Sequence, residues 1–447
     1  MIVPSAPRNA RPLTRSQLTA RISLVCLLLT AGCRTSPLTA PPSQGNLVTI
    51  HGHKGQWELL LNGRPFELRG VGVGYAHGQN GANYLAMARE MGANTVRTWG
   101  TRQGTEAYLN LAHQLGLYVN AGIWLNPVYD DGTCSYLTDT AYQRRVREET
   151  IRYVTAYRRH PAILFWNIGN ETISWTKREE ERVGFCRFLE TLIQDVHAID
   201  PNHPVIYTSA FTTDIEYVKR YVPSLDAIGL NIYGGLEEAH QTVITELNIP
   251  YVISEFGPLG PWDRPKDMNG KAIDTTDIEK AGFYEDYAKL IKNYRGYCLG
   301  GFAFTLGETS QISLTWWNLN YLAHPRLSLL TLEQLYQGTP IQNTPPFINE
   351  IELSKQQHLR PGETFEIHVR YREPEGEPVT LHYFASTDRD APILEESPNQ
   401  EVPFNVEGNG TTVTAHAPMQ PGIYRIYVVG LDPHNLAGTL SSTLSVD

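Results

Sequence analysis

The chain has 447 residues, of which 41% are hydrophobic and 19% are charged, and its formal net charge is −10. This length favours one large domain joined to one small domain. The acidic balance, with no basic run in the body of the chain, excludes a nucleic-acid-binding surface, because phosphate binding needs clustered lysine and arginine.

The first 33 residues resemble a bacterial lipoprotein signal. An apolar stretch, Ile22 to Leu29, is too short to span a bilayer and follows four arginines: Arg8, Arg11, Arg15 and Arg21. The segment Leu29-Thr30-Ala31-Gly32-Cys33 resembles a lipobox, with Thr30 at the usual leucine position. We expect export, lipidation of Cys33 and membrane anchoring in the bacterial cell envelope, at the periplasm or outer surface. A plain signal peptide with an incidental cysteine is the alternative.

Residues 34–46, rich in proline, serine and threonine, are expected to form a flexible tether. A small β-hairpin follows: β-rich runs at 48–50 and 57–61 precede the turn signal Asn62-Gly63 and the run 66–68. We expect this hairpin to cap the closed end of the domain that follows it.

From Leu68 onward, short β-rich runs alternate with amphipathic helical patterns. The helical patterns include 83–91, 106–115, 142–159, 179–198 and 279–294, and the eight predicted strands are 68–73, 95–98, 118–123, 163–168, 204–208, 227–232, 251–255 and 301–304. This rhythm predicts an α/β fold, a closed (β/α)₈ TIM barrel over residues 47–340. An open doubly wound sheet is the alternative, but Gly70-Val71-Gly72-Val73-Gly74 is not its glycine-rich phosphate turn.

A proline-punctuated segment, 339–346, ends the barrel pattern, and β-runs without helices follow it. These runs lie at 365–369, 379–383, 412–415 and 424–428. They predict a small all-β immunoglobulin-like sandwich over residues 345–447. This domain would either pack against and space the barrel or bind carbohydrate.

Three cysteines lie beyond the signal segment: Cys134, Cys186 and Cys298. Their spacing fits no zinc motif, so no metal is expected. One disulfide among the three is an open alternative in an oxidising compartment.

Two carboxylates stand where barrel chemistry is usually found, just after apolar strands. The run Ile163 to Asn170 ends in Glu171, and the run Tyr251 to Ser254 ends in Glu255. Cleaving a glycosidic bond needs two such groups, one protonated and one ionised. A salt bridge or loop contact would explain a single glutamate, but it would not explain the placement of both after the fourth and seventh strands.

These segments resemble the retaining glycoside hydrolases of clan A, in particular families 2 and 5. The segment His160 to Glu171 is similar to the one that ends in the acid/base, and Ser254-Glu255-Phe256-Gly257 is similar to the nucleophile segment. Asn94 to Gly100 is similar to the second-strand arginine segment, and Asn231-Ile232-Tyr233 to the sixth-strand tyrosine.

The resemblance implies a role for each matching side chain. Glu255 would be the nucleophile, kept ionised by Arg97 and oriented by Tyr233. Glu171 would act first as acid and then as base, with its pKa raised by an apolar environment and the nearby negative charge. Asn170 would bind the sugar 2-hydroxyl. Packing around the site is the alternative for Arg97 and Tyr233. No cofactor or metal is implied, because the carboxylates supply the chemistry.

The sequence departs from the family pattern at two strand ends. Asn231 stands where family 5 usually has histidine, and Phe302-Ala303-Phe304 lacks the usual tryptophan platform. Other side chains would then stack against or bind the sugar, with loop packing as the alternative for each: Trp124, Asn126, Trp316 and Trp317.

The predicted function is therefore retaining hydrolysis of β-glycosidic bonds in a polysaccharide or oligosaccharide, through a covalent glycosyl-enzyme. A transglycosylase that remodels a β-glucan is one alternative, because water and a sugar hydroxyl can resolve the same intermediate. A glycan-binding lipoprotein that has lost catalysis is the other, and the presence of both glutamates argues against it.

Overall fold

The computed structural model describes residues 45–78, 81–101, 104–129, 132–307, 313–388 and 400–447. These described residues belong to one compact unit. The predicted signal segment with Cys33, and the tether up to residue 44, lie outside the described residues. Within the described ranges, no helix combines the length and the apolar character needed to cross a membrane.

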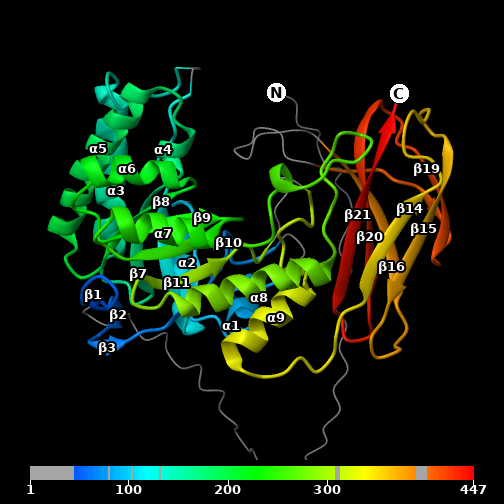
Figure 1. The fold of residues 1–447 in the computed structure, drawn as a ribbon, viewed down its shortest axis with the longest axis horizontal. Coiled ribbons are helices and arrows are strands. Elements are labelled where there is room, and N and C mark those ends of the chain that lie inside the picture. Colours follow the sequence, from blue (N-terminus) through cyan, green and yellow to red (C-terminus); the bar gives the residue numbers. More distant parts are fainter. Residues whose placement is uncertain (1–44, 79–80, 102–103, 130–131, 308–312, 389–399) are drawn as a thin grey trace, which may run out of the picture. The chain divides into compact units, whose positions relative to one another are not determined.

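Eight parallel strands close into a barrel in the order β10-β11-β4-β5-β6-β7-β8-β9 (Figure 1). The predicted TIM barrel is thus confirmed, and an open sheet is excluded. Most predicted bounds hold to within one or two residues, but β11 begins three residues earlier than expected. The strands are β4 (Leu68–Gly72), β5 (Thr95–Arg97), β6 (Tyr118–Ile123), β7 (Ile163–Asn170), β8 (Val205–Ser209), β9 (Ala227–Ile232), β10 (Tyr251–Phe256) and β11 (Cys298–Ala303).

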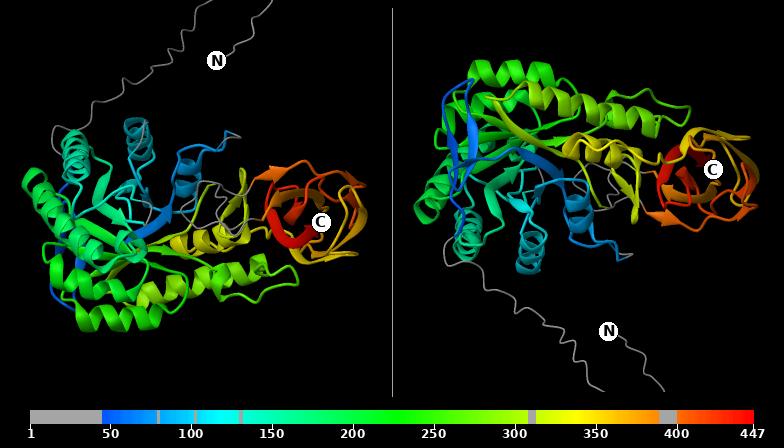
Figure 2. Two further views of the ribbon diagram at one scale, coloured as in Figure 1. Left: turned by 90° about the horizontal axis from the view of Figure 1, so that it is seen from above. Right: turned by 90° about the horizontal axis from the view of Figure 1, so that it is seen from below.

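Helices lie around the outside of these strands (Figure 2). They are α1 (Tyr84–Glu90), α2 (Thr105–Gln114), α3 (Thr140–Tyr157), α4 (Thr172–Trp175), α5 (Glu179–Ile199), α6 (Ile215–Tyr221), α7 (Leu236–Glu246), α8 (Asp277–Asn293) and α9 (Leu327–Gln337), with 3-10 turns η1 (Thr212–Asp214) and η2 (Pro261–Asp263). Helix α5 buries Phe185, Leu189, Ile193 and Val196, whose spacing of three or four residues puts them on one face. Helix α8 begins with a capping box between Thr276 and Glu279.

The predicted hairpin is present as a three-stranded sheet of β1 (Val48–His51), β2 (Glu58–Leu61) and β3 (Arg64–Pro65). Its third strand is shorter and earlier than expected, since Leu68 already belongs to the barrel. Val48 and Leu59 pack in one apolar cluster with residues near the amino-terminal ends of the barrel strands, including Leu68 and Phe165. The sheet therefore closes the end of the barrel opposite the strands' carboxyl ends.

The carboxyl-terminal part contains two four-stranded sheets, β14-β15-β19-β18 and β17-β16-β20-β21, so the predicted all-β domain is confirmed. Its strands share an apolar core of their own, including Ile367, Val413, Ile426 and Leu444. A two-stranded sheet, β12 (Asn320–Tyr321) with β13 (His324–Pro325), precedes it. The sandwich strands are β14 (Phe347–Leu353), β15 (Thr364–Arg372), β16 (Thr380–Thr387), β17 (Glu401–Val402), β18 (Val406–Glu407), β19 (Thr412–His416), β20 (Gly422–Leu431) and β21 (Ala437–Val446).

Buried polar contacts join β21 to α8 and to the loop before it. Ser441 donates a hydrogen bond of 2.5 Å to Asp274, and Asp274 pairs with Lys280 at 2.9 Å. The backbone N–H of Thr439 donates to Asp277 at 2.8 Å. All of these groups are at least 93% buried, so each depends on its partner for stabilisation.

The three cysteines of the folded part, Cys134, Cys186 and Cys298, are all buried, and no disulfide joins any of them to another. The open alternative of a disulfide among them is therefore not realised. Burial raises the pKa of the Cys186 and Cys298 thiols to about 12, which keeps both in the unreactive protonated form.

Candidate active site

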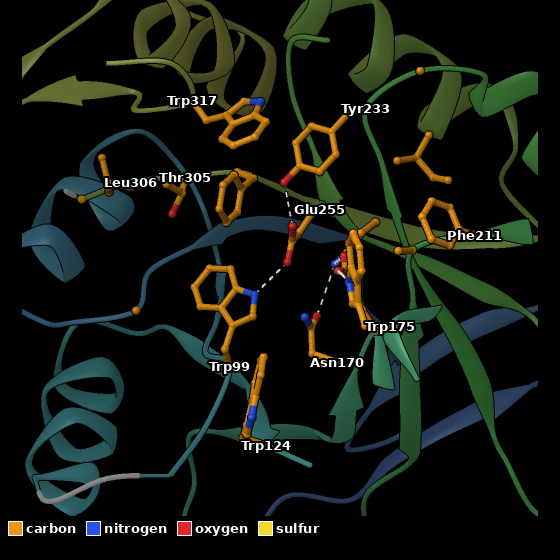
Figure 3. A pocket seen from close by; sticks show the side chains of 18 of the residues that line it. Trp99, Trp124, Asn170, Trp175, Phe211, Tyr233, Glu255, Thr305, Leu306 and Trp317 are labelled. Carbon is orange, nitrogen blue, oxygen red and sulfur yellow. Dashed lines mark hydrogen bonds between the residues drawn. The ribbon is translucent and has the colours of Figure 1, made fainter. Parts of the chain in front are cut away.

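A cavity of about 780 Å³ opens at the carboxyl ends of the barrel strands (Figure 3). Six of the eight barrel strands each contribute two or more lining residues, from the end of the strand or from the loop after it. The other two contribute one tryptophan each: Trp99 follows β5 and Trp124 follows β6. Six of the predicted site residues line this cavity: Trp124, Asn170, Glu171, Tyr233, Glu255 and Trp317.

Glu255 lies near the end of β10 and is only 7% exposed. Arg97 donates to its Oε1 at 2.5 Å, and the Trp99 indole N–H donates to the same oxygen at 2.7 Å. The Tyr233 hydroxyl donates to Oε2 at 2.6 Å. One cation and two further donors thus stabilise the ionised carboxylate and fix its orientation. Arg97 and Tyr233, which the resemblance places beside Glu255, are thus both in direct contact with its carboxylate.

Glu171 follows β7 in the left-handed backbone region, with φ of 56°. Asn231 donates to its Oε1 at 2.6 Å, and the Trp175 indole N–H donates to Oε2 at 2.6 Å. Burial, and secondly the charge of Glu255, raise the pKa of Glu171 to about 7. Its carboxyl group can therefore hold a proton near neutral pH, where an ordinary glutamate is ionised.

A short network of hydrogen bonds links the two glutamates. Arg97 binds Glu255 through Nη1 and donates to Asn170 Oδ1 through Nη2 at 2.6 Å. Asn231 donates to the same oxygen at 3.3 Å and to Glu171 at 2.6 Å. Because these bonds occupy the Asn170 oxygen, its amide N–H₂ is the group left to meet a sugar hydroxyl.

The structure separates the predicted aromatic residues into two groups. Trp124 is 37% exposed and lines the cavity, and its indole N–H donates to Asn126 at 2.8 Å, so Asn126 orients this ring from outside the cavity. Trp317 lines the wall beside Tyr233, with ring centroids 5.1 Å apart. Trp316 does not reach the cavity: it is 1% exposed and donates to the Leu259 carbonyl oxygen. The predicted contact of Trp316 with substrate is therefore not present, because its ring packs behind Trp317.

Sequence reasoning missed Trp99, Trp175 and the contact of Asn231 with Glu171. Trp99 lies two residues beyond Arg97, at the end of β5, and also stacks near the Arg97 guanidinium at 5.0 Å. Trp175 follows Glu171 by four residues, which is one helical turn. Both spacings are visible in the sequence, but neither shows that an indole N–H points to a carboxylate.

Within the described part of the chain, no group of three or more histidine, cysteine, aspartate or glutamate side chains is placed to hold a metal ion. Two carboxyl groups in the cavity, those of Glu171 and Glu255, have different environments. One is ion-paired and the other has a raised pKa. Such a pair can supply a nucleophile and a proton donor to one substrate.

Comparison with known proteins identifies a family whose sequence profile matches this chain. A sequence profile described as "Glycosyl hydrolases family 2, TIM barrel domain" matches residues 54–299. The β-glucuronidase of Rattus norvegicus is 26% identical over 189 residues, which cover 39% of this chain and 26% of that protein. The β-galactosidase of Pectobacterium atrosepticum is 28% identical over 159 residues, which cover 33% of this chain and 14% of that protein.

Among solved structures, the β-glucuronidase of Bacteroides uniformis superposes with a TM-score of 0.51 at 16% sequence identity. The match covers 90% of this chain and 48% of that chain, and it shows a shared fold. The chain thus spans about half of this structure, and its matching segments span about a quarter or less of the two curated relatives.

Proposed function

The chain belongs to glycosyl hydrolase family 2, and from this premise we propose that it is a retaining β-glycosidase acting by double displacement. Glu255 attacks the anomeric carbon, and the bond from that carbon to the leaving-group oxygen breaks. Glu171 gives its proton to the leaving oxygen. Water then donates a proton to Glu171 while its oxygen attacks the anomeric carbon, and Glu255 is released as a carboxylate.

The raised pKa of Glu171 supports this exchange of roles. Its second cause is the negative charge of Glu255. Once Glu255 is esterified to the sugar, that charge is gone, so the pKa of Glu171 falls and the group becomes a base. The same carboxyl group can therefore be an acid in the first step and a base in the second.

The single observation that carries the proposal is the contrast between an ion-paired Glu255 and a Glu171 of raised pKa in one cavity. It is tested by incubating the protein with 2-deoxy-2-fluoro-β-glycosyl fluorides of several hexoses and measuring its mass. We expect the mass of one fluorosugar to be added, on the peptide that contains Glu255.

The Glu255→Gln variant should not be labelled, whereas Glu246→Gln, on the exposed surface of α7, should be labelled like the parent. If no sugar labels the protein and none is turned over, the proposal is wrong and the alternative, a glycan-binding protein that has lost catalysis, is favoured. A label on another residue would show that Glu255 is not the nucleophile.

The charge of the cavity favours a neutral sugar. The described residues that line the cavity include three carboxyl groups, Glu171, Glu255 and Asp263, and no lysine, arginine or histidine. The buried Arg97 is already paired with Glu255. A uronate carboxylate would meet repulsion here. We therefore expect faster hydrolysis of 4-nitrophenyl β-glycosides of neutral hexoses than of the β-glucuronide, and the reverse order would contradict this proposal.

We also propose that the protein is an exported lipoprotein of the bacterial cell envelope. The proposal rests on the arginine-rich start, the apolar stretch and Cys33. In a bacterial host fed with labelled palmitate, the full chain should take up label and partition into detergent. The Cys33→Ala variant should do neither. Equal labelling of both proteins would contradict lipidation at Cys33.

A further inference from the structure

Phe211 is a large apolar side chain that remains 48% exposed beside the catalytic cavity. It follows β8, in the residue just before the 3-10 turn η1. An exposed aromatic ring at the edge of a cavity with convergent polar groups is a typical ligand contact.

The backbone around Phe211 is held in place by buried polar groups. Asp214, 4% exposed, accepts a hydrogen bond of 2.6 Å from the Ser209 hydroxyl and another from Ser174. The Ser209 hydroxyl oxygen accepts a hydrogen bond of 3.3 Å from the backbone N–H of Phe211, and Ser174 accepts one of 3.1 Å from the backbone N–H of Ala210. A buried carboxylate therefore fixes the backbone beneath a ring that itself faces solvent.

The same network fixes Phe211 relative to the proposed acid/base. Ser174 lies in α4, the short helix that begins directly after Glu171 and ends at Trp175. The rings of Trp175 and Phe211 are in edge contact, with centroids 5.9 Å apart, and Trp175 donates to Glu171 Oε2 at 2.6 Å. Figure 3 shows Trp175 and Phe211 on one side of the cavity, with Thr305 and Leu306 on the other.

This placement indicates what the two rings contact. Glu171 must touch the oxygen of the bond that breaks, since it donates the proton to that oxygen. Glu255, which attacks the sugar being transferred, is instead bound by Trp99 and Tyr233. Apolar rings joined to Glu171 rather than to Glu255 therefore face the leaving group.

We propose that Trp175 and Phe211 form a stacking site for a sugar ring of the leaving group, so that the natural substrate continues beyond the cleaved bond as an oligosaccharide or polysaccharide. The inference rests on the proposed double displacement. The apolar face of a pyranose ring covers an aromatic ring and removes it from water.

The same site would receive a sugar as acceptor. A hydroxyl oxygen of this acceptor sugar attacks the anomeric carbon of the glycosyl-enzyme, and the bond between that carbon and Glu255 breaks. Glu171 takes the proton of the attacking hydroxyl. This step is the reverse of the first displacement with a new sugar. Occupancy of the stacking site therefore favours transfer to sugar over transfer to water.

The test compares two donors of the same sugar, chosen as the hexose whose 4-nitrophenyl β-glycoside is hydrolysed fastest. One donor is the β-linked trisaccharide, which fills the stacking site, and the other is the β-glycosyl fluoride, which does not. In Phe211→Ala the ratio of kcat/KM for the trisaccharide to kcat/KM for the fluoride should fall roughly tenfold, as expected for the loss of one apolar contact.

Phe211→Tyr keeps the ring and should hold this ratio within about twofold of the parent. Met419→Ala, which removes an exposed apolar side chain of the carboxyl-terminal part, is the matched control and should leave the ratio unchanged. Phe211 is exposed, so loss of its ring leaves the fold intact, and equal melting temperatures of parent and variant would show this.

A second readout measures transfer with the glycosyl fluoride as donor and added disaccharide as acceptor. The yield of transfer product relative to hydrolysis should fall in Phe211→Ala. If both donors lose activity equally, or if neither the ratio nor the transfer yield changes, the stacking site is wrong. Either result leaves the double displacement intact, because turnover of the fluoride by the parent protein tests it separately.

Discussion

Tyr233 contributes one short hydrogen bond to the oxygen of Glu255 that Arg97 does not bind. A hydrogen bond to a charged group contributes about 1.5–3 kcal/mol. Removing the hydroxyl in Tyr233→Phe should therefore lower kcat/KM by roughly 10- to 100-fold. Steady-state kinetics with a 4-nitrophenyl β-glycoside would measure the loss.

The matched control for that change is Tyr383→Phe. The Tyr383 hydroxyl donates to the Gly410 carbonyl oxygen in the sandwich and has no contact with the cavity. This variant should retain the parent kcat/KM. Equal kinetics of Tyr233→Phe and the parent would show that the hydrogen bond does not hold the nucleophile in its reactive position.

The raised pKa of Glu171 predicts the alkaline side of the pH profile. The acid must be protonated for the first step, so kcat/KM for the trisaccharide should fall as the pH rises through about 7. The Trp175 indole N–H stabilises the ionised form and lowers this pKa. Trp175→Phe removes that donor and keeps an aromatic ring, so the fall should move to higher pH.

The glycosyl fluoride serves as the control substrate for the pH profile. Fluoride leaves with little help from a proton, so its kcat/KM should not follow the ionisation of Glu171. A shift of the alkaline limb to lower pH in Trp175→Phe would contradict the role given to the indole. An identical alkaline limb for both substrates would show that Glu171 is not the proton donor.

At the scale of elements, the junction of β7 with α4 positions Glu171, the proposed acid/base. Gly169 has φ of 87°, and a Cβ there would lie 3.2 Å from the Tyr207 ring. Gly169→Ala should therefore destabilise the fold by about 1–2 kcal/mol, the usual cost of a left-handed conformation for a residue with a side chain. Thermal and urea unfolding would measure this cost, and activity should fall further because Glu171 follows two residues later.

Gly282 offers a matched control within a helix. It lies in α8, and a Cβ there would meet no atom within 4 Å. Gly282→Ala should raise the melting temperature slightly, because alanine stabilises a helix interior by up to about 1 kcal/mol relative to glycine. A loss of stability at Gly282 equal to the loss at Gly169 would argue against a special backbone requirement at the β7–α4 junction.

The barrel strands could be predicted from the sequence because their composition reflects burial. Residues Ile163 to Gly169 of β7 are all buried, so the strand is mostly apolar, with Asn167 as the one polar residue before its polar end. The two glutamates stood out because each ends such a run. The resemblance to clan A added Arg97 and Tyr233 as candidate site residues, and in the structure both contact Glu255.

Other parts of the site depend on contacts between distant segments. Phe211 is one apolar residue in a polar loop, and only the fold brings its ring to Trp175. The tryptophan pair Trp316-Trp317 reads as one feature in sequence, yet only the second ring lines the cavity. The buried charges that join α8 to the sandwich have no sequence signature either, because charged residues are usually solvated.

At the scale of the whole molecule, the sandwich contacts the loops that form one wall of the cavity. The Tyr427 hydroxyl in β20 accepts a hydrogen bond of 3.1 Å from the backbone N–H of Leu314, three residues before Trp317. Arg425 donates to the Ala272 carbonyl oxygen at 3.1 Å, in the loop that carries Trp262. These contacts indicate that the sandwich supports the site rather than serving only as a spacer.

Asp277 is the residue through which this support can be tested. One of its oxygens binds the Arg326 guanidinium and the other accepts the backbone N–H of Thr439 in β21. Arg326 also donates to the carbonyl oxygens of Thr315 and Asn318, on either side of Trp317. Removing the carboxylate in Asp277→Ala leaves a buried cation unpaired, which typically costs about 3–5 kcal/mol.

We therefore expect the parent protein to unfold in one calorimetric transition, and Asp277→Ala to melt at a lower temperature with a reduced kcat. Lys219→Ala, which breaks an exposed pair with Glu246, should change neither quantity. Separate transitions for barrel and sandwich in the parent protein would show that the two domains are not coupled. An unchanged kcat in a folded Asp277→Ala variant would show that the buried pair holds the domains together without shaping the wall around Trp317.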